Sequence, residues 1–169
     1  TFECFDYVVA PSGSCAGMMA RHFPELFEDD PGLSARARAF AGKTHELVSF
    51  LVDVLGVERV SAAFPGKVAY HDSCHYRREL GLTATASSVL ARVEGLKVRR
   101  LAHEAECCGF GGSFSAKLPE VSDAMLSAKL DDLAGTGARV LVSTDFSCLA
   151  HIENGARAHG QTIETWTIP

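Results

Sequence analysis

Short apolar, β-branched segments that alternate with helical sequence are the feature that most limits the fold of this chain. Segments 67–71 (KVAYH) and 139–143 (RVLVS) are typical of strands, and each is followed by residues with helical character. Strands that alternate with helices form a mostly parallel sheet with helices on both faces. We therefore predict an α/β fold, with further strands at 6–10, 96–102 and 162–168.

Two long helices are predicted between these strands. Apolar residues recur with helical spacing from Ser34 to Leu55, and Gly56 then provides a C-terminal stop. A second helix is expected to begin at Pro119 and to end at 135–137. Its expected apolar positions are Val121, Ala124, Met125, Ala128 and Leu133.

Cysteines follow three of the predicted strands. Cys74 lies three residues after segment 67–71, and Cys148 lies a few residues after segment 139–143. The adjacent pair Cys107 and Cys108 follows the strand at 96–102, which alternates in polarity and is expected near a sheet edge. Because parallel α/β sheets bind ligands beyond the carboxyl ends of their strands, these thiols are expected at one rim.

The spacing of these cysteines indicates a metal site. Cys74 is separated by 32 residues from the Cys107–Cys108 pair, and Asp145 stands three residues before Cys148. Thiolates are soft ligands that favour iron–sulfur clusters or zinc. Side chains of adjacent cysteines diverge, which suits a cluster of several metal atoms better than a single ion. Asp145 could complete the ligand set or cap the following helix, as Asp often does.

Residues around the cysteines offer further candidates. Gly109 and the glycines after it permit positive φ angles and a close approach to a ligand, where amide N–H groups could donate to sulfur. His71 and His75 flank Cys74, and either could ligate metal, hydrogen-bond a coordinated thiolate or relay protons. Two other interpretations stay open: buried structural cysteines, or a nucleophilic Cys148 with His75 as its base.

The setting of the cysteines argues against a disulfide framework. The chain has six cysteines in 169 residues, with no visible export signal and no apolar run long enough to span a membrane. Reduced thiols in the cytoplasm, used for metal or redox chemistry, are therefore expected. The net charge of -5 also argues against nucleic acid as a partner.

A short internal repeat suggests two modules. Residues 7–18 overlay residues 140–151 with an offset of 133, so that Ser12 falls on Asp145 and Cys15 on Cys148. The chain is thus expected to hold the end of one module and all of a second, with the start of the first lying before Thr1. We predict that 1–60 is the tail of the first module with a connecting helix, and that 61–169 is the second.

The motifs HDSCH (71–75), ECCGFGG (106–112) and DFSCL (145–149) together resemble the cysteine-rich CCG domain. With PSGSCAGM (11–18) and the long stretch 106–126, the chain resembles the lactate utilization protein A family, which is related to a subunit of heterodisulfide reductase. The resemblance implies a [4Fe–4S] cluster, non-cubane in heterodisulfide reductase, although some CCG domains bind zinc. The ligands it implies are Cys74, Cys107, Cys108 and Cys148, with Asp145 where the family has another cysteine, and Cys15 as the remnant of the first domain.

The function implied by this resemblance is electron transfer. The chain would be an iron–sulfur component of a cytoplasmic complex that oxidises L-lactate or another 2-hydroxy acid, with other subunits as partners and no substrate chemistry of its own. A zinc-binding interaction module and a thiol–disulfide redox enzyme are the alternatives.

Overall fold

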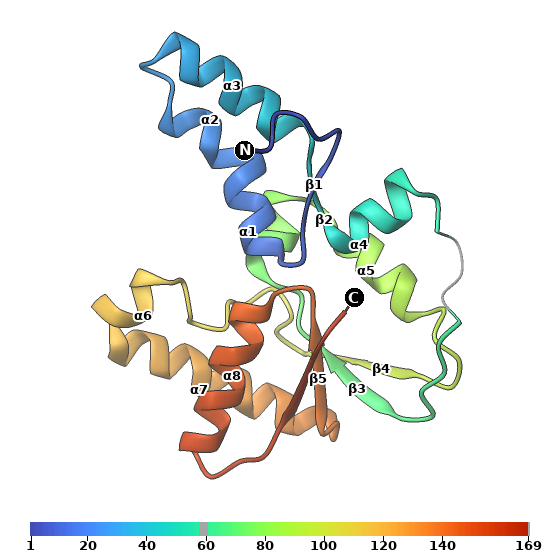
Figure 1. Cartoon of the computed structure of the whole chain (residues 1–169). Coiled ribbons are helices and arrows are strands. Elements are labelled where there is room, and N and C mark those ends of the chain that lie inside the picture. The colour runs from blue at the N-terminus through green and yellow to red at the C-terminus, as the bar shows by residue number, and fades with distance from the viewer. Residues whose placement is uncertain (58–60, 169) are drawn as a thin grey trace.

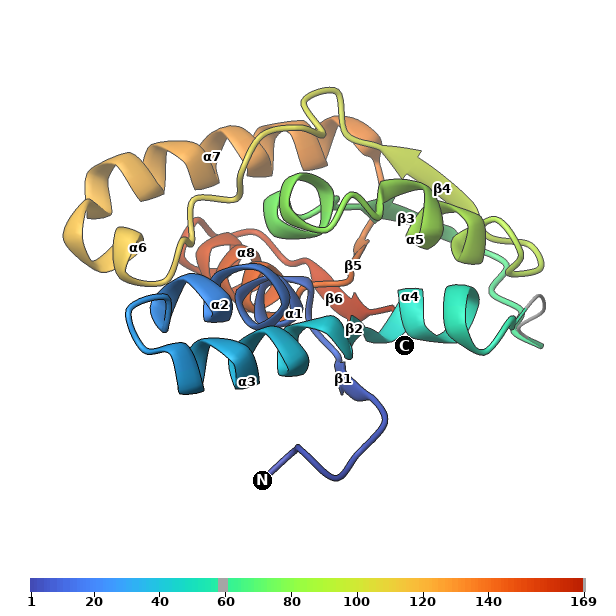
Figure 2. The same cartoon turned by 90° about the horizontal axis from the view of Figure 1, so that it is seen from above.

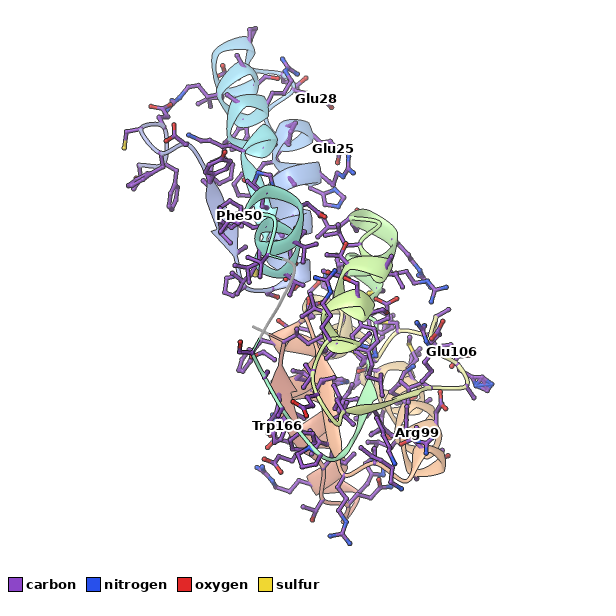
Figure 3. All side chains as sticks on the ribbon, turned by 90° about the vertical axis from the view of Figure 1, so that its right-hand side faces the viewer. Glu25, Glu28, Phe50, Arg99, Glu106 and Trp166 are labelled. Atoms are coloured by element: carbon purple, nitrogen blue, oxygen red, sulfur yellow. The ribbon has the colours of Figure 1, made fainter. Side chains whose placement is uncertain are left out.

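A four-stranded parallel sheet forms the centre of the computed structural model, which describes residues 1–57 and 61–168 (Figure 1). Its strands are β3 (Lys67–Tyr70), β4 (Lys97–Arg100), β5 (Val140–Ser143) and β6 (Glu164–Thr167), in the order β4-β3-β5-β6. Every pairing is parallel. The predicted α/β class is therefore confirmed, and β4 is an edge strand as expected. Figure 3 shows Arg99 of β4 and Trp166 of β6 at the two opposite edges of this sheet.

Helices cover both faces of this sheet because successive strand residues point to opposite sides. Ala69 and Leu141 face α7 (Pro119–Thr136) and α8 (Phe146–Ala158), in one buried apolar cluster. Val68 and Tyr70 face the other side, where they pack with residues of α4 (Leu47–Ser49) and α5 (Thr83–Leu90). None of the helices in the described part of the chain has the length and apolar character that a membrane crossing requires.

The strand order reverses direction between β3 and β5. From β3 the chain moves outward to β4, whereas from β5 it moves the other way to β6. Such a switch point opens a crevice at the carboxyl ends of the two central strands, where open α/β sheets bind ligands. Segments 71–75 and 144–148 leave those two ends, so the sheet topology itself brings Cys74 and Cys148 together.

The N-terminal part of the chain repeats half of this arrangement. β1 (Val8–Ala10) pairs in parallel with β2 (Thr44–Glu46), as β5 pairs with β6. Helical residues follow β1 from Gly13 to Leu26 and then form α3 (Pro31–Gly42). Figure 2 shows α3 and α7 on opposite sides of the molecule, with α1 (Gly13–Gly17) and α8 between them. The domain division at residues 60 and 61 stays a prediction, and residues 58–60 beside it lie outside the described residues.

The predicted helix from Ser34 to Leu55 is wrong, because β2 interrupts it. Lys43 leaves the helical conformation, the Thr44 hydroxyl donates to the Phe40 carbonyl, and residues 44–46 pair with β1. The Glu46 carboxylate then accepts from the Ser49 N–H and starts the next helical segment. Pairing with β1, together with the side-chain bonds of Thr44 and Glu46, thus overrides the apolar periodicity. Within the described residues, the remaining helical segments are α2 (Phe23–Leu26), α6 (Ser113–Lys117) and the π-helical turns η1 (Met18–His22), η2 (Phe50–Val54) and η3 (His75–Glu79).

The predicted apolar face of α7 is also largely wrong. Val121 is 49% exposed, and the helix instead buries a stripe rotated by about one residue. The sheet lies on the side of Leu126, Leu130 and Leu133, which contact α8 and β5. The buried stripe of this helix consists of Ser122, Leu126, Lys129, Leu130 and Leu133. Ser122 and Lys129, the two polar residues of this stripe, contact the loop that carries Cys107 and Cys108.

Candidate metal centre

The four cysteines predicted as ligands line a single cavity of about 570 Å³. Cys74 follows β3, Cys107 and Cys108 lie in the loop after β4, and Cys148 is in the first turn of α8. All six cysteines of the chain are free thiols. The structure therefore brings together thiols from three separate segments at the carboxyl end of the sheet, while metal binding by them stays a prediction.

Within the cavity the sulfur atoms form two close groups. The Sγ atoms of Cys74 and Cys107 are 3.9 Å apart. On the buried side, ligand atoms of Cys108, Cys148 and His71 all lie within 4.8 Å of one another. Cys107 and Cys108 thus have different further neighbours, Cys74 on one side and Cys148 on the other, while a hydrogen bond also joins their own two thiols.

Hydrogen bonds from polar side chains of α7 hold the loop that carries Cys107 and Cys108. The Asp132 carboxylate accepts from the N–H groups of Ala102 and His103, each at 2.8 Å. The Lys129 ammonium donates to the His103 carbonyl at 3.0 Å, and the Ser122 hydroxyl donates to the Gly109 carbonyl at 2.8 Å. These bonds hold an irregular segment in place without regular secondary structure.

Gly109 is the tightest point of this loop. Its φ angle is +90°, and a Cβ atom would lie 2.6 Å from the Ser122 carbonyl oxygen. Its N–H donates to the Cys107 sulfur at 3.4 Å. A glycine at this point of the sequence predicts close approach to a ligand; the structure shows that it also allows close approach to α7.

The loop after β3 is held by Asp72. The hydroxyl groups of Tyr70 and Thr83 donate to its two carboxylate oxygens at 3.3 and 2.8 Å. Cys74 lies just beyond this anchor, and the His75 Nδ1 atom is 3.5 Å from the Cys74 sulfur. This distance fits the predicted role of His75 as a hydrogen-bond partner of a coordinated thiolate.

Asp145 is a helix cap that also joins two distant segments. Its Oδ1 atom accepts from the N–H groups of Ser147 and Cys148, and it caps α8 as one alternative predicted. Its Oδ2 atom accepts from the Ser14 N–H at 2.7 Å. Both carboxylate oxygens are therefore engaged with backbone donors, and the side chain is only 1% exposed.

Cys15 lies on the wall of the same cavity. The internal repeat predicts it as the remnant of a first site, separate from the second module. In the structure Cys15, Met18, Met19 and Phe23 form a side of the cavity that holds the other four thiols. No sequence pattern indicates this proximity, because it depends on how the segment after β1 packs against residues 144–145.

Hydrogen bonds among the thiols shift their pKa values in opposite directions. Bonds from the Cys108 and Cys74 thiols and from the Gly109 N–H lower the pKa of Cys107 to about 2. The same bonds, with burial, raise the pKa of Cys108 and of Cys74. Of these thiols, Cys107 therefore loses its proton most readily, and the thiolate is the form that ligates metals.

Two basic side chains, His71 and Lys129, lie beside these thiols and are both buried. Burial, with a smaller effect of the Lys129 charge, lowers the pKa of His71 to about 4. Burial likewise lowers the pKa of Lys129, although nearby acidic groups and the cysteines oppose this. Lys129 is not among the residues predicted from the sequence, because the apolar positions expected for α7 place its buried stripe about one residue too early.

Lys129→Met is expected to raise the free energy of unfolding of the metal-free protein by about 1 kcal/mol at pH 7, because an apolar chain replaces a buried cation. The pKa of Lys129 is lower in the native protein than the ordinary 10.5, so between these two pKa values the unfolded chain binds more protons than the native protein. The free energy of unfolding therefore rises with pH in that range. The variant should lose this rise. Urea unfolding from pH 7 to 10 measures both effects.

Lys117→Met is the matched control, since Lys117 is exposed at the end of α6. It should change the free energy of unfolding by less than about 0.5 kcal/mol, as surface substitutions usually do. Destabilisation by Lys129→Met with an unchanged pH profile would show that the bond to the His103 carbonyl outweighs the desolvation of the charge.

The chain is similar to known proteins over most of its length. Residues 68–153 match the CCG family, described as a cysteine-rich domain. Lactate utilization protein A from Shouchella clausii is 46% identical over 97% of the chain and 68% of its own length. The chain belongs to the lactate utilization protein A family of CCG-domain proteins. Relatives from an Exiguobacterium species and from Bacillus cereus are 50% and 43% identical over 95% and 99% of this CCG protein.

The matched region contains the whole predicted ligand set. Cys74, Cys107, Cys108, Asp145 and Cys148 all lie within residues 68–153, whereas Cys15 lies outside them. The chain spans 65% of the length of the Exiguobacterium relative and 70% of the Bacillus cereus one.

Proposed function

We propose that this CCG protein carries electrons through an iron–sulfur cluster held by Cys74, Cys107, Cys108 and Cys148. The observation that carries the proposal is the convergence of these four thiols, from three segments, on one cavity at the switch point of the sheet. The donor set also fits such a group, since it combines soft sulfur with a Cys107 thiolate. When bound, the cluster would supply one-electron redox chemistry.

The protein's own contribution is to position and shield this site. The bonds from α7 hold the Cys107–Cys108 loop, and the Asp72 anchor holds the loop before Cys74. The Gly109 N–H donates to the Cys107 sulfur, and hydrogen bonds to cluster sulfurs adjust the reduction potential. Met18, Met19 and Phe23 cover one side with apolar atoms, which limits access of water.

Lactate oxidation is the pathway in which we place this function. The names of the relatives refer to lactate utilization, and we infer that the chain works with other subunits of a cytoplasmic system that oxidises L-lactate. This assignment is tested by growth on lactate. A strain without the full-length gene should lose such growth and regain it from the wild-type gene, but not from the Cys107→Ala/Cys108→Ala gene.

The cluster itself is tested by metal analysis after anaerobic purification. Wild-type protein should be brown and contain iron and acid-labile sulfide. Loss of outer hydrogen-bond partners alone costs about 10–100-fold in metal affinity, so Cys107→Ala/Cys108→Ala should reduce bound iron at least about tenfold. Cys4→Ala is the control, because Cys4 is exposed and is not among the cavity residues. Full iron in the double variant would exclude the ligand assignment.

A zinc site is the second candidate, and the compact group on the buried side favours it. A Zn–S distance of about 2.3 Å places two sulfurs on one ion at most about 4.6 Å apart. The ligand atoms of His71, Cys108 and Cys148 lie within a similar 4.8 Å. Colourless protein with one zinc per chain would support this structural role over electron transfer.

Thiol–disulfide exchange is the third candidate. The 3.9 Å separation of the Cys74 and Cys107 sulfurs, with Cys107 as thiolate, is the observation in its favour. If exchange between these two thiols is the function, Cys107→Ser should abolish it while metal content stays unchanged. Loss of metal in that variant would instead support Cys107 as a ligand.

A further inference from the structure

His71 is a completely buried histidine with no hydrogen-bond partner for its ring. Its side chain is 0% exposed, and neither Nδ1 nor Nε2 has a partner among the residues that the structure describes. A buried polar group left unsatisfied costs about 1–3 kcal/mol, so such groups are normally paired. A ring with two unpaired nitrogens therefore points to a ligand that binds there.

The position of this ring is imposed by its neighbours along the chain. The His71 N–H donates to the Val142 carbonyl at 2.9 Å, which continues the pairing of β3 with β5. Asp72, the next residue, is held by Tyr70 and Thr83. The backbone thus cannot turn His71 toward solvent without breaking the sheet and the anchor together.

The groups that the ring does approach are sulfur ligands. Its nitrogen lies within 4.8 Å of the Sγ atoms of both Cys108 and Cys148. Imidazole nitrogen and thiolate sulfur are found together at zinc and at iron–sulfur centres of the Rieske type. The arrangement therefore has the composition of a mixed nitrogen–sulfur metal site.

Asp145, the other candidate for a non-cysteine ligand, is already engaged. Its Oδ2 atom accepts from Ser14 at 2.7 Å, and its Oδ1 atom accepts from two N–H groups of α8. Coordination by Asp145 would compete with a helix cap and with a link between two segments. Coordination by His71 would break no hydrogen bond of the described structure.

We propose that His71, and not Asp145, is the non-cysteine metal ligand of this site, together with Cys108 and Cys148. The inference rests on the proposed metal centre. Of the three roles that the sequence leaves open for His71, it selects direct coordination of the metal. Replacement of a thiolate by a neutral imidazole raises the potential of a cluster, as the Rieske centres show.

Selective isotope labelling of the full chain tests this proposal. Protein with ¹⁵N-labelled histidine is reconstituted anaerobically with ferrous iron and sulfide, and pulsed EPR is recorded in the paramagnetic oxidation state. We expect the strong nitrogen coupling of a coordinated imidazole, and no such coupling in His71→Cys. A bound cluster without histidine coupling in the wild type would overturn the proposal and leave the iron–sulfur function intact.

Variants separate direct coordination from a hydrogen bond. His71→Cys should keep its iron and shift the reduction equilibrium at least about tenfold toward the oxidised form, which is about 59 mV for one electron. His75→Ala is the control, because His75 also contacts a ligand cysteine. This variant should retain the nitrogen coupling, since His71 is unchanged in it. If His71→Cys does not fold, the result from the labelled wild type still decides, and His71→Asn provides a second variant.

Absence of iron and sulfide from the reconstituted wild type would contradict the proposed electron-transfer function alone. In that case zinc is added, and X-ray absorption at the zinc edge gives the ligand set. A nitrogen neighbour that disappears in His71→Cys supports the assignment of His71. A shell of sulfur only, or an oxygen neighbour that disappears in Asp145→Asn, overturns it.

Discussion

Asp145→Ala is expected to lower the free energy of unfolding of the metal-free protein by about 2–4 kcal/mol. Loss of a helix N-cap costs about 1 kcal/mol. Loss of the Oδ2 acceptor also leaves the Ser14 N–H without its partner, which adds about 1–3 kcal/mol. Urea unfolding followed by circular dichroism measures the sum.

Two further variants divide this effect into its parts. Asp30→Ala removes a cap from α3 with the same geometry, since Asp30 accepts from the N–H groups of Gly32 and Leu33. Asp30 is exposed and, among the described residues, has no second contact of the kind that Asp145 makes, so its loss should cost only about 1 kcal/mol. Asp145→Asn keeps one oxygen acceptor, so its loss of free energy of unfolding should lie between those of Asp145→Ala and Asp30→Ala. Equal losses for Asp145→Ala and Asp30→Ala would show that the contact with Ser14 contributes nothing.

The convergence of the cysteines could be predicted because it depends on the parallel direction of the strands. Short β-branched segments followed by helical sequence imply parallel strands, and the loops after parallel strands all leave the sheet at the same edge. Cys74, Cys107, Cys108 and Cys148 all satisfy this rule. The same reasoning predicted the cap formed by Asp145, because it requires only one residue and the helix after it.

Features that depend on tertiary packing could not be predicted in this way. The strand β2 was missed because its pairing with β1, 36 residues earlier, outweighs a helical apolar pattern. Lys129 was missed because the buried side of α7 is chosen by the position of the Cys107–Cys108 loop. Cys15 reaches the cavity through the contact of Ser14 with Asp145, which joins residues 131 positions apart.

Gly109→Ala is expected to be among the most destabilising single substitutions, and it should lower the free energy of unfolding by about 2–5 kcal/mol. A side chain in the left-handed region costs about 1–2 kcal/mol. The added Cβ would also lie 2.6 Å from the Ser122 carbonyl oxygen and 3.1 Å from the Met125 Cβ. Because α7 is packed against the sheet, the loop must move instead, at a further cost of about 1–3 kcal/mol.

This movement should reach the metal centre, since Gly109 directly follows Cys108 and donates to the Cys107 sulfur. Gly109→Ala should therefore bind less iron than the wild type even at temperatures at which it remains folded. Gly112→Ala is the matched control: Gly112 also has a positive φ of +57°, but its Cβ would meet nothing within 4 Å. Its ψ of -108° also disfavours a side chain, so Gly112→Ala should lower the free energy of unfolding by about 1–3 kcal/mol and keep its metal. Equal metal loss in both variants would mean that general flexibility of the loop, and not its contact with α7, positions the two cysteines.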